Sequence, residues 1–327
     1  MELSNKSAVK NLLKKYNARP EKYLGQHFIL SKKALKTMIE AAEIPHPLKK
    51  DGGLKDIIIE IGPGLGTLTK KLAETDTKVI AIEKDPLMIE ILKETLTNYK
   101  NVKVIQADAR QIWRGPSEAA RQLSIPRIDS FGDKLWITIH KGKYKIVANL
   151  PYNVATFLIR QWLESKNPPQ GMVLMIQKEV AQRIVAKPPH SNLLGISVQF
   201  YADVRIIDYV KKELFWPKPK VDAAIIKIIP HNRKLASFAS DSKQMMPRDI
   251  KRVFFRIVKA GFSQPRKQLV GNLAKKLKIP KEKILNIFKM LEISEKTRAE
   301  NLSLKDWINI TNKIDTIFSA KGGSAYG

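Results

Sequence analysis

Short apolar runs alternate with amphipathic stretches through the first 230 residues of this 327-residue chain. Each apolar run is bounded by polar or turn-forming residues, as expected for buried strands, and the stretches between carry apolar residues at helical spacing. Strands separated by helices usually build a parallel sheet. The pattern therefore predicts an α/β domain, with candidate strands at residues 56–61, 78–83, 102–106, 144–149, 172–177, 196–204 and 223–229 and helices at 31–43, 67–74, 86–98 and 154–164.

This alternation stops in two places, which suggests how the chain is divided. Residues 110–142 are too long for a simple connection and mix Pro and Gly with aromatic residues, so we interpret them as an insertion. After residue 230 the sequence becomes polar and then helical to about residue 319. We expect a basic N-terminal extension (1–22), an α/β domain (23–230), a small all-helical domain (231–319) and a flexible tail (320–327).

The net charge of the chain indicates what kind of partner it binds. Lys and Arg total 59 against 31 Asp and Glu, a formal net charge of +28. Neutralising phosphates releases counterions, so this excess favours a nucleic acid, although solubility or a membrane-surface helix are alternative explanations. The expected helical domain carries the sharper signal, because four basic residues share one face of an amphipathic helix and two more follow it: Arg248, Arg252, Arg256, Lys259, Arg266 and Lys267.

Several classes of site are not supported by the sequence. The chain has no Cys, which excludes disulfides, thiolate metal sites and cysteine nucleophiles. Its five His lack metal-ligand spacing, and neither a Walker-type loop nor a Ser/His/Asp order is found. No apolar run reaches the roughly 20 residues that span a bilayer, and the N-terminal residues lack the apolar core of a secretory signal. We expect a cytoplasmic protein with no metal and no membrane partner.

A glycine-rich turn follows the first expected strand and opens a helix. Its sequence is Glu60-Ile61-Gly62-Pro63-Gly64-Leu65-Gly66-Thr67. Glycines permit tight turns and let a ligand approach the backbone, although such a turn can also be purely structural. A dinucleotide fingerprint would require Gly where Thr67 stands. The Gly-x-Gly-x-Gly form instead favours S-adenosylmethionine, with contacts from Gly62, Gly64 and Gly66.

Two acidic residues strengthen this interpretation. Glu83 ends the second expected strand, where its carboxylate can accept hydrogen bonds from both ribose hydroxyls. Asp108 follows the third strand, where it can accept a hydrogen bond from the adenine amine of the cofactor. Either acid alone is more often a solvated loop residue. Together they mark the carboxyl edge of the sheet, where open α/β sheets bind ligands.

The motif Asn149-Leu150-Pro151-Tyr152 ends the fourth expected strand and is the most chemically specific in the chain. An adenine amine is a poor nucleophile, because its lone pair is delocalised into the ring. If the Asn149 side-chain oxygen and the Leu150 carbonyl accept its two N–H bonds, the nitrogen can aim its lone pair at a sulfonium methyl. Pro151 would then stiffen the Leu150 carbonyl, and Tyr152 would stack on the base. The alternative is a turn that merely buries a tyrosine.

A base held in a helix cannot enter such a pocket, so the target must be flipped out or already unpaired. The segment Phe215-Trp216-Pro217-Lys218-Pro219-Lys220-Val221-Asp222 is stiff, aromatic and basic. Phe215 can therefore cover the opposite face of the base. Taken alone, this segment could equally be a hydrophobic plug at the edge of the sheet.

The chain resembles the small-subunit ribosomal RNA adenine dimethyltransferases. The resemblance is carried by the motifs described above and by four further segments, Leu24-Gly25-Gln26-His27-Phe28, Gln177-Lys178-Glu179, Arg266-Lys267 and residues 298–303. Relatives of that family include the erythromycin-resistance methyltransferases and the mitochondrial transcription factor B proteins. The resemblance runs from Tyr23 to about Trp307. It implies a seven-stranded, Rossmann-like class I methyltransferase sheet with a small helical C-terminal domain.

The resemblance also implies an activity and its site. S-adenosylmethionine would donate methyl groups to the exocyclic amino groups of adjacent adenines near the 3′ end of small-subunit rRNA. The expected substrate is an immature ribosomal subunit, and the expected enzyme is a monomer. Asn149, Leu150 and Tyr152 would hold the target base, with Phe215 opposite. The implied cofactor contacts are His27, Ile29, Gly62, Glu83, Asp108 and Asn149.

Three positions depart from the family pattern. His27 stands where many members have Asn, which adds a titratable group, and Ile29 replaces the usual Leu. Pro265 replaces a basic residue beside Arg266. Two other functions stay open. One is methylation of large-subunit rRNA, as in antibiotic resistance. The other is a non-catalytic ribosome-assembly or transcription factor on the same fold.

Overall fold

The computed structural model describes residues 3–21, 25–44, 57–112, 143–231 and 248–319. The chain divides into two compact units, one of residues 1–181 and 203–230 and one of residues 182–202 and 231–327. Most of the predicted insertion (113–142) and the predicted tail (320–327) lie outside the described residues. The two units are described separately below.

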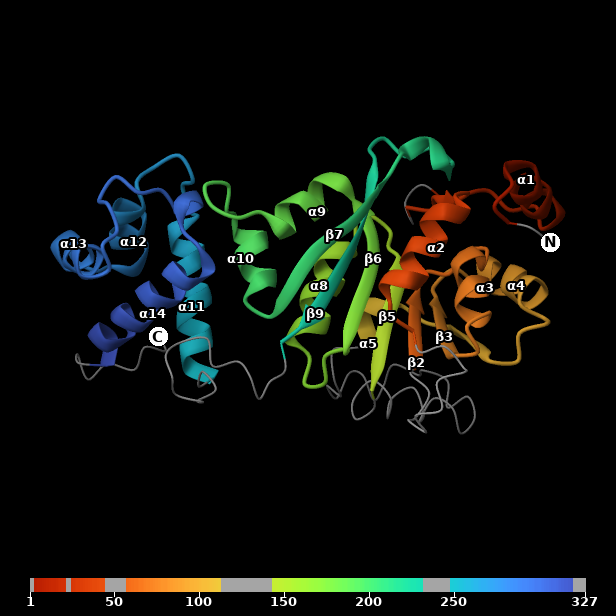
Figure 1. Cartoon of the computed structure of the whole chain (residues 1–327), viewed down its shortest axis with the longest axis horizontal. Helices are drawn as coiled ribbons and strands as arrows, with labels where there is room; N and C mark the ends of the chain where they lie inside the picture. Colours follow the sequence, from red (N-terminus) through yellow and green to blue (C-terminus); the bar gives the residue numbers. More distant parts are fainter. Residues whose placement is uncertain (1–2, 22–24, 45–56, 113–142, 232–247, 320–327) are drawn as a thin grey trace. The chain divides into compact units, whose positions relative to one another are not determined.

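A seven-stranded sheet forms the centre of the first unit, as predicted (Figure 1). The first five of its strands along the chain run parallel, and the last runs antiparallel to its neighbour. Parallel sheets are buried on both faces, which explains the near-continuous apolar runs in the sequence. In spatial order the strands are β4 (Val102–Gln106), β3 (Lys78–Glu83), β2 (Ile57–Ile61), β5 (Tyr144–Asn149), β6 (Gly171–Gln177), β9 (Ala223–Pro230) and β7 (Ala202–Val210).

The helices between these strands begin near the predicted positions. Ser31 and Asp85 are N-caps, and their side chains accept hydrogen bonds from the N–H groups of Ala34 and Leu87. Pro86 occupies the first turn of its helix, where a missing N–H costs nothing. The helices are α1 (Lys6–Lys15), α2 (Lys32–Ala41), α3 (Thr67–Ala73), α4 (Pro86–Thr95), α5 (Ala109–Ile112), α8 (Ala155–Glu164) and α9 (Lys178–Val185), which runs into the second unit.

The predicted strand at residues 196–204 is wrong. Residues Leu193–Gln199 form a helix, α10, and β7 begins only at Ala202. Asn192 caps α10 by accepting a hydrogen bond from the Gly195 N–H, and Ile196 is buried in the core of the second unit. A short apolar run fits a strand and a buried helix equally well, so its periodicity could not decide between them.

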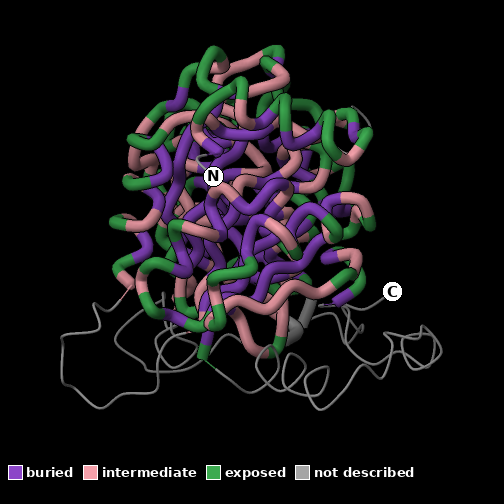
Figure 2. The backbone as a smooth tube through the Cα atoms, turned by 90° about the vertical axis from the view of Figure 1, so that its right-hand side faces the viewer, coloured by how far each residue is buried: buried purple, intermediate pink, exposed green. Residues whose placement is uncertain are grey.

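Helix α1 lies within the segment expected as an N-terminal extension. It packs on the first unit, because Leu12 and Leu13 join a buried cluster with Leu65 and Met88. Lys15 and Tyr16 both contact the Glu94 carboxylate on α4. Figure 2 shows this side of the molecule, with buried residues running through the interior and exposed ones around it. The segment is thus part of the folded unit that contains the sheet.

The second unit is helical and has its own core. Phe254, Phe288 and Trp307 are fully buried in one cluster, which also takes in Ile196 of α10. Gly261 ends the first helix after residue 231, and a Cβ there would collide with the Trp307 ring. Its elements are α10, α11 (Arg248–Gly261), α12 (Leu269–Leu277), α13 (Lys281–Met290), the 3-10 helix η3 (Ala299–Asn301) and α14 (Leu304–Ser319).

Candidate active site

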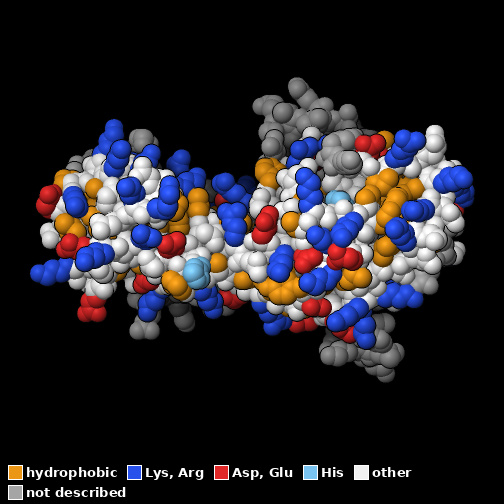
Figure 3. All heavy atoms as spheres, turned by 90° about the horizontal axis from the view of Figure 1, so that it is seen from above, with side chains coloured by type: hydrophobic (Ala, Val, Ile, Leu, Met, Phe, Trp, Pro, Cys, Tyr) orange, Lys and Arg blue, Asp and Glu red, His pale blue; other side chains and the backbone are white. Residues whose placement is uncertain are grey.

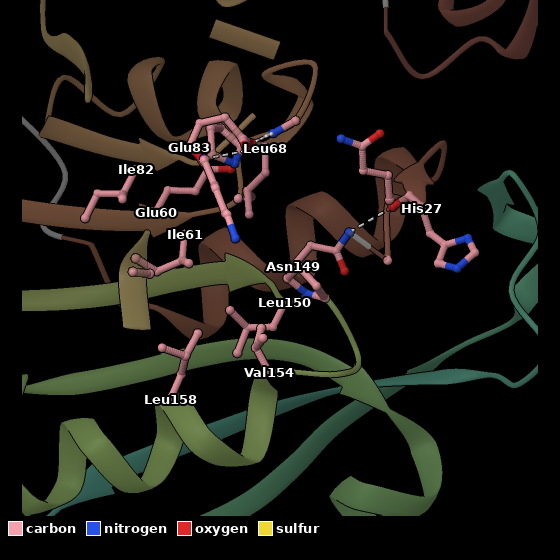
Figure 4. A pocket seen from close by; sticks show the side chains of 18 of the residues that line it. His27, Glu60, Ile61, Leu68, Ile82, Glu83, Asn149, Leu150, Val154 and Leu158 are labelled. Carbon is pink, nitrogen blue, oxygen red and sulfur yellow. Dashed lines mark hydrogen bonds between the residues drawn. The ribbon is translucent and has the colours of Figure 1, made fainter. Parts of the chain in front are cut away.

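A cavity of about 280 Å³ opens at the carboxyl ends of β2, β3 and β5 (Figure 4). Glu60 and Glu83 lie on one side of it, and apolar side chains including Val154 and Leu158 lie on the other. The cavity therefore offers acidic and apolar walls to one ligand, as small-molecule sites commonly do. It brings together most of the residues predicted for the site, namely His27, Ile29, Gly62, Gly64, Glu83, Asp108, Asn149, Leu150, Pro151, Tyr152 and Phe215.

The glycine-rich turn forms the floor of the cavity. Gly62 and Gly64 have φ angles of 67° and 55°, which other residues rarely adopt. A Cβ on Gly64 would lie 3.1 Å from the Phe28 ring, so the turn is also tightly packed. Gly66 is not among the residues that line the cavity. It packs against α4, where a Cβ would lie 3.1 Å from Leu92, and its contact with the cofactor stays a prediction.

The Glu83 carboxylate is held by backbone N–H groups. Its Oε1 accepts from Lys84 at 2.7 Å and Asp85 at 2.9 Å, and its Oε2 accepts from Gly64 at 3.2 Å. Burial raises the pKa of Glu83, and these hydrogen bonds act in the opposite direction. The carboxylate thus joins the end of β3 to the glycine-rich turn and has a fixed orientation at the cavity.

Asn149 ends β5 with its amide oriented by a backbone contact. Its Nδ2 donates to the His27 carbonyl oxygen at 3.2 Å, as Figure 4 shows. Because the amide nitrogen has this acceptor, the side-chain oxygen remains as the acceptor for a ligand. The Leu150 N–H donates to the Met175 carbonyl at 3.0 Å, which anchors the motif to β6. The nitrogen of the Asn149 amide is therefore bound to the backbone, and its role towards a target amine stays a prediction.

Tyr152 lies over the same end of the cavity. Its ring centroid is 5.7 Å from that of His27, with an angle of 30° between the planes. Its hydroxyl is buried and has no hydrogen-bond partner within the described residues. Burial, aided by the Asp222 carboxylate, raises the pKa of Tyr152 to about 12, so the phenol stays neutral. A neutral aromatic ring suits stacking on a base.

His27, which directly precedes β1 (Phe28–Ile29), and Ile29 of that strand both line the cavity. This strand pairs antiparallel with β8 (Phe215–Trp216), and Ile29 lies opposite Phe215. Phe215 is only 3% exposed and packs in the core while also lining the cavity. The His27 Nδ1 lies 2.7 Å from the Pro217 carbonyl oxygen, and the ring points away from Asn149 in Figure 4. The backbone of His27, rather than its ring, thus faces Asn149.

Asp108 is surrounded by cations that the sequence analysis did not single out. The Arg110 Nε lies 3.0 and 3.1 Å from its two oxygens, and the Lys84 Nζ lies 3.3 Å from Oδ2. The hydrogen bond from Arg110 is the main cause that lowers the pKa of Asp108 to about 2. Asp108 is therefore ionised at neutral pH, and an adenine amine would share its carboxylate with Arg110.

Glu60 is a second residue that the sequence analysis did not assign. It lines the cavity, is 1% exposed, and its Oε2 lacks a hydrogen-bond partner in the part of the chain described. Burial, with a smaller contribution from Glu83, raises the pKa of Glu60 to about 8. The only signal in the sequence was an acid within an otherwise apolar strand, Ile57-Ile58-Ile59-Glu60-Ile61.

The buried Glu60 predicts a specific pH dependence of stability. Its pKa rises from 4.5 to about 8 on folding, so between these values the folded chain binds more protons than the unfolded one. Its contribution to stability is present below pH 4.5 and is lost as the pH rises towards 8. We expect Glu60→Gln to melt at a higher temperature than the parent at pH 8.5, with a smaller difference at pH 5. Equal differences at both pH values would contradict this assignment.

The predicted basic face lies on α11 of the second unit. Arg252, Arg256 and Lys259 are exposed on α11, and its opposite side is buried. The side chain of Arg248 lies outside the described part of the helix. Arg266 and Lys267 are exposed and line a groove. The lining of this groove contains no carboxylate and four further cationic side chains, Lys275, Lys276, Lys296 and Arg298. Figure 3 shows Lys and Arg side chains spread over the face that it presents.

Among the residues that the structure describes, no group of three or more His, Cys, Asp or Glu side chains is placed to hold a metal ion. No helix in the described ranges is long and apolar enough to cross a membrane.

Comparison with known proteins gives consistent matches over most of the chain. Residues 17–316 match the family model described as ribosomal RNA adenine dimethylase. The chain is similar to the ribosomal RNA small subunit methyltransferase A of Dehalococcoides mccartyi, with 35% identity over 91% of this chain and 89% of the relative. It is also similar to the protein of that name from Clostridioides difficile, with 33% identity over 98% and 99%.

Solved structures show the same fold. A dimethyladenosine transferase from Plasmodium falciparum superposes with a TM-score of 0.63 and 25% identity, covering 90% of this chain and 98% of that one. The 23S rRNA methyltransferase ErmE superposes with a TM-score of 0.61 and 19% identity, covering 88% and 99%. The second likeness concerns the fold alone.

Proposed function

Because this chain belongs to the ribosomal RNA adenine dimethylase family, we propose how its site performs that reaction and on which RNA. The family expected from the sequence motifs is confirmed, and the protein is an rRNA adenine dimethyltransferase. We propose S-adenosylmethionine as the methyl donor. The proposed targets are the exocyclic amines of adjacent adenines near the 3′ end of small-subunit rRNA, in an immature subunit. We also propose that the enzyme acts as a cytoplasmic monomer.

The residues of the cavity fit this donor. Gly62 and Gly64 line the cavity with backbone that carries no side chain, and the N-terminus of α3 has no side-chain cap. Glu83 presents a fixed carboxylate suited to ribose hydroxyls, while Asp108 is ionised and within the same cavity. S-adenosylmethionine supplies an electrophilic methyl group on its sulfonium. The protein then needs only to bind the donor and the target base, to orient them towards each other and to exclude water.

The orientation of the Asn149 amide is the observation on which the proposal chiefly depends. With its nitrogen hydrogen-bonded to the His27 carbonyl, the oxygen can accept one N–H of the target amine. The Leu150 carbonyl would accept the other, and Tyr152 would stack on the base. Two fixed acceptors favour a pyramidal nitrogen, and the preorganised dipoles lower the barrier without a strong base.

The alternative functions are less well supported. The similar curated relatives are named for the small subunit, which does not favour methylation of large-subunit rRNA. A non-catalytic factor would not need Glu83, Asn149 and Tyr152 gathered around one cavity.

Incubation with undermethylated small subunits and labelled S-adenosylmethionine tests the proposed substrate. We expect label on two adjacent adenines near the 3′ end of the small-subunit RNA, mapped by nuclease digestion and mass spectrometry. Mature large subunits serve as the control and should stay unlabelled. Label on large-subunit RNA, or on isolated adenines elsewhere, would overturn the proposed substrate.

The basic face of α11 predicts a change in salt dependence. Each phosphate contact contributes roughly 0.7 to 0.9 to the slope of log affinity against log salt. The double variant Arg252→Ala/Arg256→Ala should therefore bind RNA more weakly, with a slope reduced by about 1.4 to 1.8. Binding is measured by filter retention at several salt concentrations. The variant Lys283→Ala/Lys289→Ala removes equal charge from exposed positions on α13 and should change the slope less. An unchanged slope in the α11 variant would mean that this face does not contact RNA.

A further inference from the structure

An exposed aromatic side chain lies at the carboxyl edge of the sheet, outside the cavity. Tyr209 is the penultimate residue of β7 and is 47% exposed. The Lys178 Nζ lies 5.4 Å from its ring centroid, within the range of a cation–π interaction. Lys178 begins α9, directly after β6. The ring is thus held by a cation from a neighbouring element while much of its surface remains open to solvent.

Asp222 connects this pair to three elements of the sheet. Its backbone carbonyl accepts from the Lys178 N–H at 3.0 Å, and its Oδ1 accepts from the Lys212 N–H at 3.0 Å. The Lys211 Nζ lies 3.6 Å from its Oδ2. The next residue along, Ala223, pairs with Gln177 of β6. These contacts fix the junction of β6 and α9 against the end of β7 and the start of β9.

Strand β6 relates this pair to the site of reaction. Asn149, at the end of β5, pairs with Met175 of β6, and the Leu150 N–H donates to the Met175 carbonyl at 3.0 Å. Lys178 follows shortly after Met175, at the start of α9. Tyr152, from the motif that begins at Asn149, lines the cavity in which the target adenine is proposed to bind. Lys178 and Tyr209 therefore lie at the same edge of the sheet as the Asn149–Tyr152 motif.

The chemistry of this surface suits an unpaired base. Exposed aromatic rings bind single-stranded nucleic acid by stacking, and neighbouring lysines contact its phosphates. Lys211 and Lys220 are both exposed near the Tyr209 end of β7. The proposed reaction modifies two adjacent adenines, so the neighbour of the base in the cavity must also be accommodated as the strand is opened.

We propose that Tyr209 is a stacking platform for the unpaired base next to the target adenine, with Lys178 holding the ring in place. This rests on the proposed function, since the neighbour is defined by the target. By stacking on this neighbouring base, Tyr209 would hold the RNA strand so that the target adenine lies at the cavity. Tyr209 does not touch the reacting atoms. It is a nucleobase subsite separate from the methyl-donor cavity.

A fluorescent base provides a direct test that does not require methyl transfer. A short RNA carries 2-aminopurine in place of the adenine next to the target, and stacking on a tyrosine quenches its fluorescence. The parent enzyme and Tyr209→Phe should quench it, because both keep the ring. Tyr209→Ala should not. Equal quenching by Tyr209→Ala and the parent would overturn the proposal, whether or not the RNA is methylated.

Kinetics with undermethylated small subunits provide the second readout. We expect Tyr209→Ala to raise the KM for subunits about tenfold, as for other base–aromatic stacks. The Kd for S-adenosylmethionine and the melting temperature should be unchanged, and Tyr209→Phe should retain most of the parent KM. Arg205→Ala is the control, because Arg205 is exposed on the same strand and four residues away.

Two kinetic outcomes would count against the platform. One is an unchanged KM in Tyr209→Ala, and the other is an equal rise in Arg205→Ala, which would indicate a general surface effect. Absence of any methylation by the parent would instead overturn the proposed function. In that case the fluorescence experiment still decides whether Tyr209 stacks on a base.

Discussion

Replacing Asn149 by Ala is expected to lower the rate of methyl transfer at saturating substrates at least about a hundredfold. The loss of one preorganised hydrogen-bonding group from an active site commonly costs this much. In the structure the Asn149 nitrogen donates to the His27 carbonyl, and in the proposed mechanism its oxygen accepts a hydrogen bond from the target amine. The variant removes the acceptor and also removes the hydrogen bond to the His27 backbone.

The measurements on this variant must separate chemistry from binding. Single-turnover transfer with preformed enzyme–subunit complex reports the chemical step, and calorimetry reports the affinity for S-adenosylmethionine. We expect the affinity to fall far less than the rate, because Glu83 and the glycine-rich turn remain. Asn98→Ala, at an exposed position after α4, serves as the control and should behave like the parent. Full activity in Asn149→Ala would refute the proposed role of the amide.

Replacing Glu83 by Ala is expected to weaken S-adenosylmethionine binding at least about a hundredfold. Hydrogen bonds to a charged group contribute roughly 1.5 to 3 kcal/mol each, so two ribose hydroxyls together account for about 3 kcal/mol or more. A change of 1.4 kcal/mol is tenfold in affinity. The variant also removes the acceptor of the Gly64 N–H, which loosens the glycine-rich turn.

Two further variants sharpen this experiment. Glu83→Gln keeps one acceptor oxygen without the charge, so its Kd should lie between those of the parent and Glu83→Ala. Glu90→Ala removes an exposed glutamate of α4 that forms an ion pair with Lys93, and its Kd should stay at the parent value. Calorimetry or equilibrium dialysis measures each Kd. A parent-like Kd in Glu83→Ala would exclude the carboxylate from the donor site.

Much of the architecture was predictable because local signals and the final fold agree. Apolar runs flanked by turns became β2 to β6, and the helices predicted to begin at residues 31 and 86 are α2 and α4, which Ser31 and Asp85 cap. The glycine-rich turn and the Asn149–Tyr152 motif lie at carboxyl ends of neighbouring strands. Because parallel strands all end at the same edge, residues after different strands converge without any further information.

Other features depended on which segments the fold brings together. Residues 196–199 became helical because Ile196 packs into the helical unit, and Gly66 packs against α4 instead of lining the cavity. The neutral state of Glu60 depends on its burial, and the partners of Asp108 depend on where Arg110 and Lys84 point. None of these contacts has a characteristic spacing in the sequence.

The sequence by itself determined the type of fold, the glycine-rich turn, the acids and the Asn149–Tyr152 motif that is proposed to bind an adenine amine. These follow from residue type and short-range order, since a strand, a tight turn or a capped helix involves only near neighbours. Only the tertiary structure decided the orientation of the Asn149 amide, the charge of Glu60 and the pairing of Tyr209 with Lys178. Each depends on contacts or desolvation by segments distant in the chain, because electrostatic and hydrogen-bonding environments are set in space rather than along the sequence.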